Sequence, residues 1–320
     1  MENHTLNSPM LLVEGFSLSS CLSLGVWAFI FLSFLFIMVA NGLVVSAVIA
    51  DRRLHQPMYL LFCNLAINDI VANTNILPWV LLDMLRPPSE RVITYPECVY
   101  QAFTAHLLAT GVSAILMVMA FDRYVAICHP LRYSQIMTHR TLARLIVSAW
   151  TVTLVLVSVL LGLTIRLSRC RLLVVGLYCS NAALFGLSCE SVVVNNIYGL
   201  TFTVVLYVSS VGSMVLTYGS ITIVCLRSHT LNRKALQTCS SHLLVYLLSL
   251  FSGLVTIIST RFPQARQERH LASLMYFIIP ASLNPLIYGL PSKEIRNFVF
   301  SVFSRALPTQ TYSLITALHF

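Results

Sequence analysis

Seven long apolar runs constrain this chain more than any other feature of its sequence. They lie near residues 24–50, 58–82, 98–121, 145–165, 192–226, 235–260 and 271–290. Each is long enough for a helix to cross a hydrocarbon core of ~30 Å at a rise of ~1.5 Å per residue. Only helices and closed barrels satisfy their backbone in lipid, and the alternating strands of a barrel are absent from the sequence. The expected fold is therefore all-α, a seven-transmembrane helix bundle.

The composition agrees with a chain that faces lipid. Hydrophobic residues make up 57% of the chain and charged residues only 10%, whereas a soluble domain carries about 25% charged residues. The net charge is +9, but the Lys and Arg residues lie in short clusters between the apolar runs. These clusters favour membrane lipids and a cytosolic protein as partners, and argue against nucleic acid.

The distribution of charge predicts which way the bundle points. Alternate connections hold twelve of the twenty Lys and Arg residues with only three acids, whereas the opposite side holds eight with seven acids. The basic side is expected to be cytoplasmic, which places the N-terminus outside the cell. Asn3 begins an Asn-His-Thr glycosylation sequon on that outer side. The domains expected are an extracellular N-terminus (1–23), the seven-helix domain (24–290) and a cytoplasmic segment (291–320).

The cytoplasmic segment has the pattern of a short amphipathic helix. Its apolar residues follow helical spacing and are Ile295, Phe298, Val299, Val302 and Phe303. Basic residues accompany them at Lys293, Arg296 and Arg305. We expect this helix to lie on the inner membrane surface after the last span.

Local motifs identify the class of seven-helix protein. The third run ends in the sequence MAFDRYVAICHPLRY at residues 119–133. Further motifs follow at 57–60 (PMYL), 64–69 (NLAIND), 217–218 (TY), 234–243 (KALQTCSSHL) and 283–288 (LNPLIY). Together, over roughly residues 20–305, the chain closely resembles the odorant-receptor branch of the rhodopsin-like G-protein-coupled receptors.

The resemblance implies a set of residues for activation and G-protein coupling. They are Asp122, Arg123, Tyr124, Tyr218, Lys234, His242, Asn284, Pro285 and Tyr288. Arg123 beside Asp122 can form a local ion pair at the membrane edge, and breaking that pair would free a cation for an incoming G-protein helix. Pro285 removes a backbone donor and weakens the last helix locally. The alternative for His242 is a satisfied polar residue inside the bundle.

Asp69 is the only acidic residue deep within a span, which makes it a functional candidate. The resemblance implies a sodium ion or a water cluster at Asp69, with Asn41 and Asn284 nearby. Odorant receptors usually carry a Glu where this chain has Val112. A sodium site and a hydrated, protonatable Asp69 are therefore both open.

Four cysteines fall on the predicted outer side, where thiols are oxidised. Cys98 opens the third run, and Cys170, Cys179 and Cys189 lie in the long connection before the fifth. Four cysteines allow three pairings. The family resemblance implies the pairs Cys98–Cys179 and Cys170–Cys189.

In the family that the chain resembles, the ligand binds in the outer half of the bundle. This implies a ligand site formed by His106, Ala109, Thr110, Phe202, Thr203, Leu206, Gly253, Ile257, Arg261, Leu274 and Phe277, with Gln101, Ala102, Ala105 and His270 on the same faces. Arg261 and His106 are the polar candidates, and an Arg can pair with the carboxylate of a small organic acid. Alternatively, Arg261 extends to lipid headgroups or pairs with Glu268.

Two absences exclude familiar ligand chemistries. Residues 98–121 contain no carboxylate, so the counter-ion of amine receptors is missing, and the last run contains no Lys for a retinal Schiff base. Leu250 stands where the branch usually has a bulky aromatic residue, so either Phe251 takes that role or coupling differs. An intramembrane enzyme would need a nucleophile with a base or a metal cluster, and none has suitable spacing.

The sequence therefore predicts an odorant receptor of the plasma membrane, without enzymatic activity or a cofactor. It is expected to bind small organic ligands and to activate a heterotrimeric G protein of the olfactory stimulatory type, which raises cAMP. A transporter or channel is the main alternative, but such proteins often show repeated halves and midplane charges. This chain shows no internal repeat.

Overall fold

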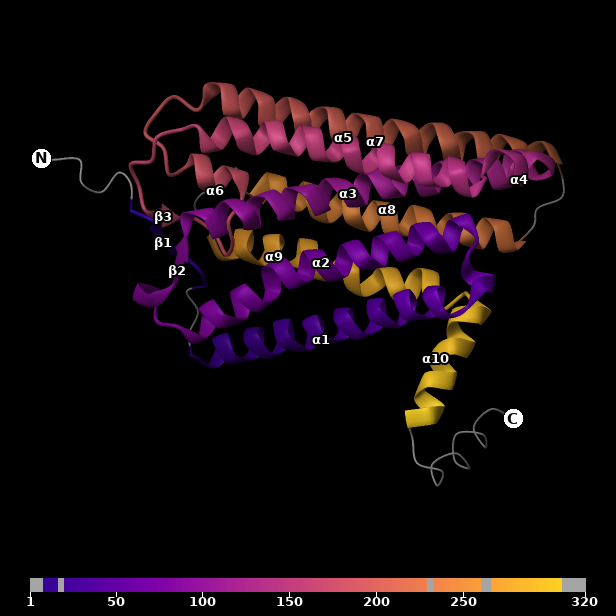
Figure 1. Ribbon diagram of the computed structural model, residues 1–320, viewed down its shortest axis with the longest axis horizontal. Coiled ribbons are helices and arrows are strands. Elements are labelled where there is room, and N and C mark those ends of the chain that lie inside the picture. Colours follow the sequence, from indigo (N-terminus) through magenta and orange to yellow (C-terminus); the bar gives the residue numbers. More distant parts are fainter. Residues whose placement is uncertain (1–7, 17–19, 229–232, 260–265, 307–320) are drawn as a thin grey trace, which may run out of the picture.

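The computed structural model describes residues 8–16, 20–228, 233–259 and 266–306. Seven long helices run side by side as one bundle (Figure 1). They are α1 (Ser20–Ala50), α2 (Pro57–Leu85), α3 (Tyr95–Cys128), α5 (His139–Ile165), α7 (Val193–Ser228), α8 (Arg233–Ser259) and α9 (Arg266–Asn284). All seven are long and apolar enough to cross a membrane. The predicted fold class is confirmed, and the chain is a multi-pass membrane protein.

Most of these helices extend beyond the apolar runs that predicted them. α3 begins at Tyr95 because a capping box precedes it: the Thr94 hydroxyl accepts from the Glu97 N–H at 3.4 Å, and the Glu97 carboxylate accepts from the Thr94 N–H at 3.1 Å. At its other end α3 continues through the polar residues after 121 as far as Cys128. Hydropathy reports where a helix is apolar, whereas caps decide where it begins.

Short elements gather at the two ends of the bundle (Figure 1). One end carries a three-stranded sheet, in which β1 (Met10–Val13) pairs antiparallel with β2 (Val92–Thr94) and parallel with β3 (Leu173–Val174). The short helix α6 (Asn181–Phe185) lies at the same end, which we call the sheet end. The opposite end carries α4 (Tyr133–Ile136) and α10 (Lys293–Ala306), and we call it the α10 end.

Four single-turn elements complete the described part of the chain. They are the 3-10 turns η1 (Arg52–Leu54), η2 (Pro88–Glu90) and η3 (Pro130–Arg132), and the π-helical turn η4 (Pro285–Gly289). η4 continues α9 directly and begins at the proline that was expected to weaken this helix. The sheet was not anticipated, because its strands have only two to four residues and give no pattern of alternation.

The helices bury one face in the bundle and expose apolar side chains on the other. The interior forms clusters near the sheet end, in the middle and near the α10 end, centred on residues such as Val157, Ile76 and Leu116. On the outside, Ile49 and Leu216 are each more than 70% exposed. In water such a surface would aggregate, so its natural surroundings are the hydrocarbon chains of a bilayer.

The short helix predicted after the last span is α10, which runs across the direction of the bundle (Figure 1). Ile295 is buried, and Phe298 and Val299 pack against the cluster near the α10 end. Val302 is exposed, and the side chains of Phe303 and Arg305 lie outside the described residues. The first part of the apolar face of α10 therefore packs against the bundle, whereas Val302 further along is exposed.

Candidate functional site

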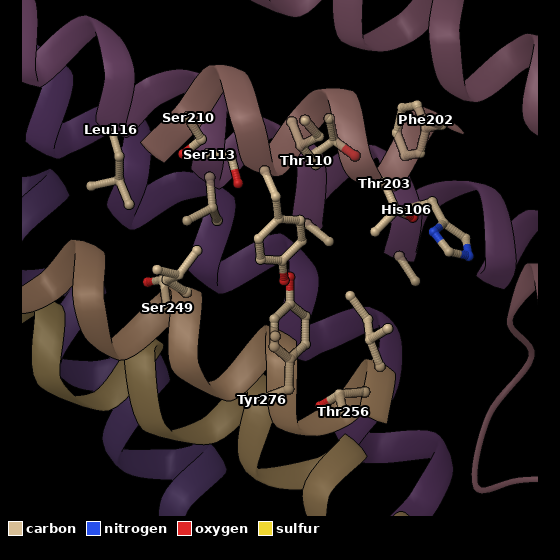
Figure 2. A pocket seen from close by; sticks show the side chains of 18 of the residues that line it. His106, Thr110, Ser113, Leu116, Phe202, Thr203, Ser210, Ser249, Thr256 and Tyr276 are labelled. Atoms are coloured by element: carbon tan, nitrogen blue, oxygen red, sulfur yellow. The ribbon is translucent and has the colours of Figure 1, made fainter. Parts of the chain in front are cut away.

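A cavity of about 210 Å³ opens inside the bundle between α3, α7, α8 and α9 (Figure 2). Tyr178 and Ser180, from the segment between β3 and α6, complete its lining. The helices contribute Ala105, His106, Ala109, Thr110, Val112, Ser113, Leu116, Phe202, Thr203, Leu206, Tyr207, Ser210, Tyr246, Ser249, Leu250, Gly253, Thr256, Ile257 and Tyr276. The lining is mainly apolar with scattered hydroxyl groups, and none of these described residues is formally charged apart from a protonatable His106.

The hydrogen bonds of the lining decide what it can offer a ligand. The Asn181 N–H donates to Nε2 of His106 at 3.1 Å, so the neutral imidazole carries its proton on Nδ1. The Thr203 hydroxyl donates to the Gly199 carbonyl at 2.7 Å, which leaves its oxygen as an acceptor. The Ser249 hydroxyl is buried and has no partner among the described residues. The cavity can therefore exchange neutral hydrogen bonds with a ligand.

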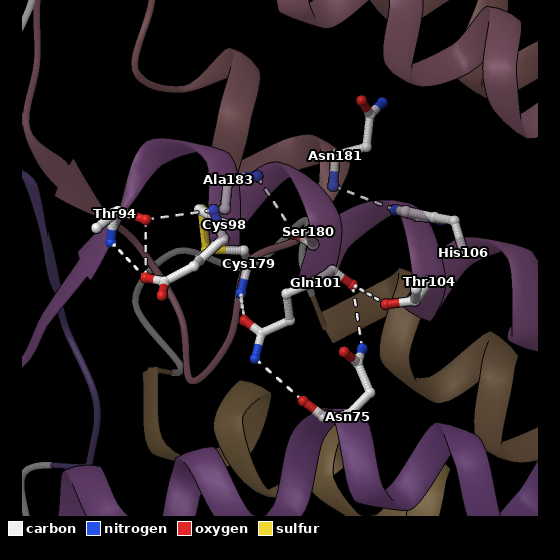
Figure 3. The surroundings of a disulfide bond; sticks show 11 residues. Asn75, Thr94, Cys98, Gln101, Thr104, His106, Cys179, Ser180, Asn181 and Ala183 are labelled. Carbon is white, nitrogen blue, oxygen red and sulfur yellow. Dashed lines mark hydrogen bonds between the residues drawn. A yellow bond between two sulfur atoms is a disulfide. The ribbon is translucent and has the colours of Figure 1, made fainter. Parts of the chain in front are cut away.

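A disulfide fixes the segment that covers the cavity. Cys98 at the start of α3 is bonded to Cys179, with their Cα atoms 5.2 Å apart. The Gln101 side chain accepts from the Cys179 N–H at 2.8 Å and donates to the Asn75 carbonyl at 3.3 Å (Figure 3). This ties Tyr178 and Ser180 to α3 and α2. Burial raises the pKa of Tyr178 to about 12, so its phenol remains a neutral donor at physiological pH.

The second disulfide lies within the same long connection. Cys170 is bonded to Cys189, with their Cα atoms 5.8 Å apart. These two bonds are the same pairs that the family resemblance implies. Among the other cysteines whose side chains are described, four are unpaired: Cys63, Cys128, Cys225 and Cys239. All four lie on membrane-spanning helices.

The structure brings together most of the residues proposed for ligand binding. Eight of them line the cavity: His106, Ala109, Thr110, Phe202, Thr203, Leu206, Gly253 and Ile257. Leu274 and Phe277 lie elsewhere, in the buried cluster in the middle of the bundle. Their neighbour Tyr276 takes the place expected for them, because one residue turns a helix by about 100°. Arg261 lies outside the described residues.

The other polar candidates have structural partners. Gln101 holds the covering segment, as described above. His270 faces the Glu14 carboxylate at 3.3 Å, together with Arg266 at 2.8 Å and Arg269 at 3.7 Å. This contact ties the segment after β1 to the start of α9.

Four tyrosines line the cavity and were missed from the sequence. They are Tyr178, Tyr207, Tyr246 and Tyr276. Tyr207 and Tyr246 follow the helical spacing of residues that were chosen, four after Thr203 and seven before Gly253, so periodicity could have found them. Tyr178 lies in a loop, and only its position next to Cys179 points toward the cavity.

A buried polar layer lies below the cavity, around Asp69. The Asn284 amide donates to the Asp69 carboxylate at 2.7 Å, and the Asn41 amide donates to the Ala281 carbonyl at 3.0 Å. A space of about 30 Å³ adjoins Asp69, lined also by Asn68, Asn73 and Ser249. Such a space holds about one water molecule. Asp69 is the single carboxylate in this described lining, so water fits the site better than a sodium ion, and we derive no step through sodium.

At the α10 end, Asp122 and Arg123 form an ion pair within α3. The Tyr133 hydroxyl of α4 donates to the other carboxylate oxygen at 2.8 Å, and Asp122 is fully buried. Burial and the neighbouring Asp122 raise the pKa of Tyr133, so it stays a neutral donor. Tyr124 points elsewhere and contacts His129, with 3.3 Å between the hydroxyl and Nε2.

His242 of α8 lies between two of the tyrosines proposed for activation. Its Nδ1 is hydrogen-bonded to the Tyr218 hydroxyl of α7, and its ring centroid is 6.4 Å from that of Tyr288 in η4. His242 is therefore a buried residue with a defined partner. The Lys234 side chain lies outside the described residues. Phe251 is 68% exposed on the outside of α8, so it does not take the internal role left open by Leu250, which lines the cavity.

Comparison with known proteins gives one consistent result. A family model described as "Olfactory receptor" matches residues 29–306. The chain is 33% identical to mouse olfactory receptor 2A7 over 311 residues, covering 96% of this chain and 98% of the mouse protein. It is 35% identical to human olfactory receptor 7G2, covering 83% of each chain. Human olfactory receptor 2H2 is 34% identical, covering 90% of this chain and 93% of the human protein.

Proposed function

We propose a ligand site and a signalling mechanism for this chain, which belongs to the olfactory receptor family, whose members are G-protein-coupled receptors and not enzymes. It senses an odorant and couples to a G protein. Our proposal is that the odorant binds in the cavity between α3, α7, α8 and α9. The observation that carries the proposal is the lining itself, a mainly apolar surface with a few convergent polar groups, which is typical of small-molecule sites.

The chemistry of the lining favours a small, neutral organic ligand. Its described part offers the Nδ1–H of His106 and phenol groups as donors, and the Thr203 oxygen as an acceptor, without a fixed charge. An alcohol, ketone, aldehyde or ester matches these groups. Burying a polar ligand atom without a partner is costly, so the positions of these groups would select among ligands of similar size.

A carboxylate is a second, narrower proposal for the ligand, and it depends on Arg261. If its guanidinium reaches the cavity, the ligand is a carboxylate, because a bidentate pair would repay the burial of both charges. Replacing Arg261 by Ala separates the two classes. Responses to carboxylates should then fall while responses to neutral ligands persist.

For signalling, we propose that ligand binding shifts a two-state equilibrium. The closed Asp122–Arg123 pair, with Tyr133 on its other oxygen, represents the resting arrangement. Movement of α8 would take His242 away from Tyr218 and open the α10 end to a G-protein helix. In this proposal the partner is the olfactory stimulatory G protein, which raises cAMP.

The sheet end is extracellular, the α10 end is cytoplasmic, and the receptor works in the plasma membrane with Asn3 glycosylated.

The test is a cAMP reporter assay in cells that display the full-length receptor, using a panel of alcohols, aldehydes, ketones, esters, amines and acids. Thr203→Val removes a hydroxyl from the cavity while keeping the shape of the side chain. Thr151→Val is the matched control, because the exposed Thr151 of α5 also donates its hydroxyl to the carbonyl four residues earlier and does not line the cavity.

We expect Thr203→Val to raise the half-maximal concentration of oxygen-bearing agonists about 5–13-fold, from the loss of a hydrogen bond of ~1–1.5 kcal/mol. Thr151→Val should leave it unchanged. Equal effects of the two variants would contradict the proposed ligand site. A surface-displayed receptor that responds to no member of a broad panel would contradict the odorant-receptor function.

A further inference from the structure

A second hollow lies on the outside of the bundle, between α3, α5 and α7. It has a volume of about 470 Å³, more than twice that of the internal cavity, and within the range of ~300–1,000 Å³ that ligand pockets occupy. α3 packs against both other helices, and all three are membrane-spanning segments. We call this hollow the lipid-facing groove.

Small side chains make the groove. Ala114 of α3, Ser148 and Ala149 of α5 and Ser209 of α7 line it at positions where larger residues would fill the space between the helices. The groove opens outward, since Val152 is 58% exposed and Val205 is 59% exposed. It is therefore continuous with the surface that the spanning helices present to the bilayer.

Four of the six polar side chains that line the groove donate to backbone carbonyls. The Ser148 hydroxyl donates to the Leu145 carbonyl at 2.9 Å, and the Ser209 hydroxyl donates to the Leu206 carbonyl at 3.1 Å. The Thr153 hydroxyl donates to the Ala149 carbonyl at 2.8 Å. None of the described lining residues is charged. Such a surface, without charge and with most of its hydroxyl groups occupied, favours hydrocarbon over a polar headgroup.

The shape of the groove matches a single extended hydrocarbon chain. On α5 the lining runs from Leu145 to Leu156, eleven residues further on, which is about 16 Å along the helix at ~1.5 Å per residue. This is about half of the ~30 Å hydrocarbon core, the depth of one leaflet. The helices run across the bilayer, as do the chains of its lipids.

We propose that the lipid-facing groove binds one acyl chain of a bilayer phospholipid. The site also adjoins the internal cavity, because Thr110, Phe202 and Leu206 line both spaces. A chain in the groove supports the outer side of this shared wall, and a ligand in the cavity presses on its inner side. Lipid binding and ligand binding are thereby coupled, with reciprocal effects on the two affinities.

The test uses the purified full-length receptor in phosphatidylcholine nanodiscs that contain a photoreactive phosphatidylcholine with a diazirine in the middle of one acyl chain. After illumination, mass spectrometry measures the labelling of peptides from α3, α5 and α7. This measurement requires no odorant, so its failure is distinct from a failure of the proposed ligand site. We expect the groove peptides to be labelled more strongly than other lipid-exposed helix faces.

Ser209→Phe places a ring in the groove from an exposed position, and we expect it to remove most of the groove labelling. Ser158→Phe is the matched control, an exposed serine on α5 that does not line the groove. Ala149→Leu fills the groove from the opposite wall and serves as a second variant should Ser209→Phe fail to fold. Labelling that is uniform around the bundle, or unaffected by either filling variant, would overturn the proposal. Displacement of the label by added cholesterol would also overturn it, by assigning the groove to a sterol.

Discussion

At the scale of the residue, Gly253 determines how much of the cavity is open. A methyl group at this position would meet the Tyr207 hydroxyl and approach the Tyr276 ring to 3.4 Å. Both tyrosines line the cavity, so an added side chain would take its space from the ligand or displace a ring. The absence of a side chain at one position of α8 thus sets the upper limit on ligand size.

We expect Gly253→Ala to narrow the range of ligands. Overpacking costs ~1–2 kcal/mol for the larger agonists, which corresponds to a rise in half-maximal concentration of about 5–30-fold. Smaller members of the same chemical series should be affected less. The measurement is a set of cAMP dose–response curves for a homologous series of increasing chain length. Gly212→Ala on α7 is the control, because nothing lies within 4 Å of its added methyl group. A shift that is the same for every chain length would count against the size limit.

Some of the residues that line the cavity could be predicted from the sequence and others could not. Helical periodicity selected residues of α3, α7 and α8 that do line the cavity, because position along a helix predicts its face. On α9 the selected residues Leu274 and Phe277 face the core, whereas Tyr276 faces the cavity. Both faces of α9 are apolar here, so hydropathy alone does not distinguish them. The contribution of Tyr178 depends on how a loop folds, for which the sequence gives no periodic signal.

At the scale of the element, a contact between α3 and α4 joins two helices at the α10 end, in the arrangement proposed above as the resting state. The Asp122 carboxylate has Arg123 on one oxygen and Tyr133 on the other, and the second contact joins two helices. A hydrogen bond to a charged group contributes ~1.5–3 kcal/mol. If this bond exists only in the resting state, its loss favours the active state.

We expect Tyr133→Phe to raise basal cAMP in the absence of any ligand. A shift of ~1–2 kcal/mol changes the equilibrium constant between the two states about 5–30-fold. The assay is ligand-free cAMP normalised to surface display. Tyr100→Phe is the control, because Tyr100 is 66% exposed near the sheet end of α3 and its hydroxyl makes no hydrogen bond with described residues. Unchanged basal activity at equal display would show that Tyr133 does not favour the resting state.

Most elements were predictable from the sequence, and the exceptions have physical reasons. Seven spans and the helix after them follow from hydropathy and spacing. Pro285 indicated a weak point in the last helix, but not that the chain would form a π-helical turn there, since this depends on how Tyr288 packs against Phe62 and His242. The sheet depends on pairing between segments that are about 80 residues apart, such as Met10 with Thr94.

At the scale of the whole molecule, the short elements of the sheet end form a cover over the bundle. β1 joins β2 and β3, the two disulfides hold the long connection, and Arg91 donates to the carbonyls of Glu14 and Phe16. Glu14 then ties the cover to α9 through its ion pairs. Residues 8–16, which precede the first span, are therefore an integral part of the fold.

We expect Glu14→Gln to loosen this cover. The Glu14 side chain is only 9% exposed, so losing its charge removes pairs with Arg266 and Arg269 that contribute on the order of 1–3 kcal/mol. Hydrogen exchange should become faster in residues 10–16 and at the start of α9. Glu90→Gln is the control, because Glu90 is exposed and has no ion pair within the described part of the chain. Equal exchange in both variants and the unchanged receptor would contradict the role given to Glu14.

The smallness of the internal cavity has a consequence for timing. A space of about 210 Å³ admits few ligand atoms, and each non-hydrogen atom contributes at most ~1.5 kcal/mol to binding. With micromolar affinity and association near ~10⁶ M⁻¹ s⁻¹, a bound molecule leaves within about one second. Occupancy then follows the surrounding concentration almost without delay. Because the ligand dissociates quickly, the receptor responds to the end of a stimulus as promptly as to its beginning.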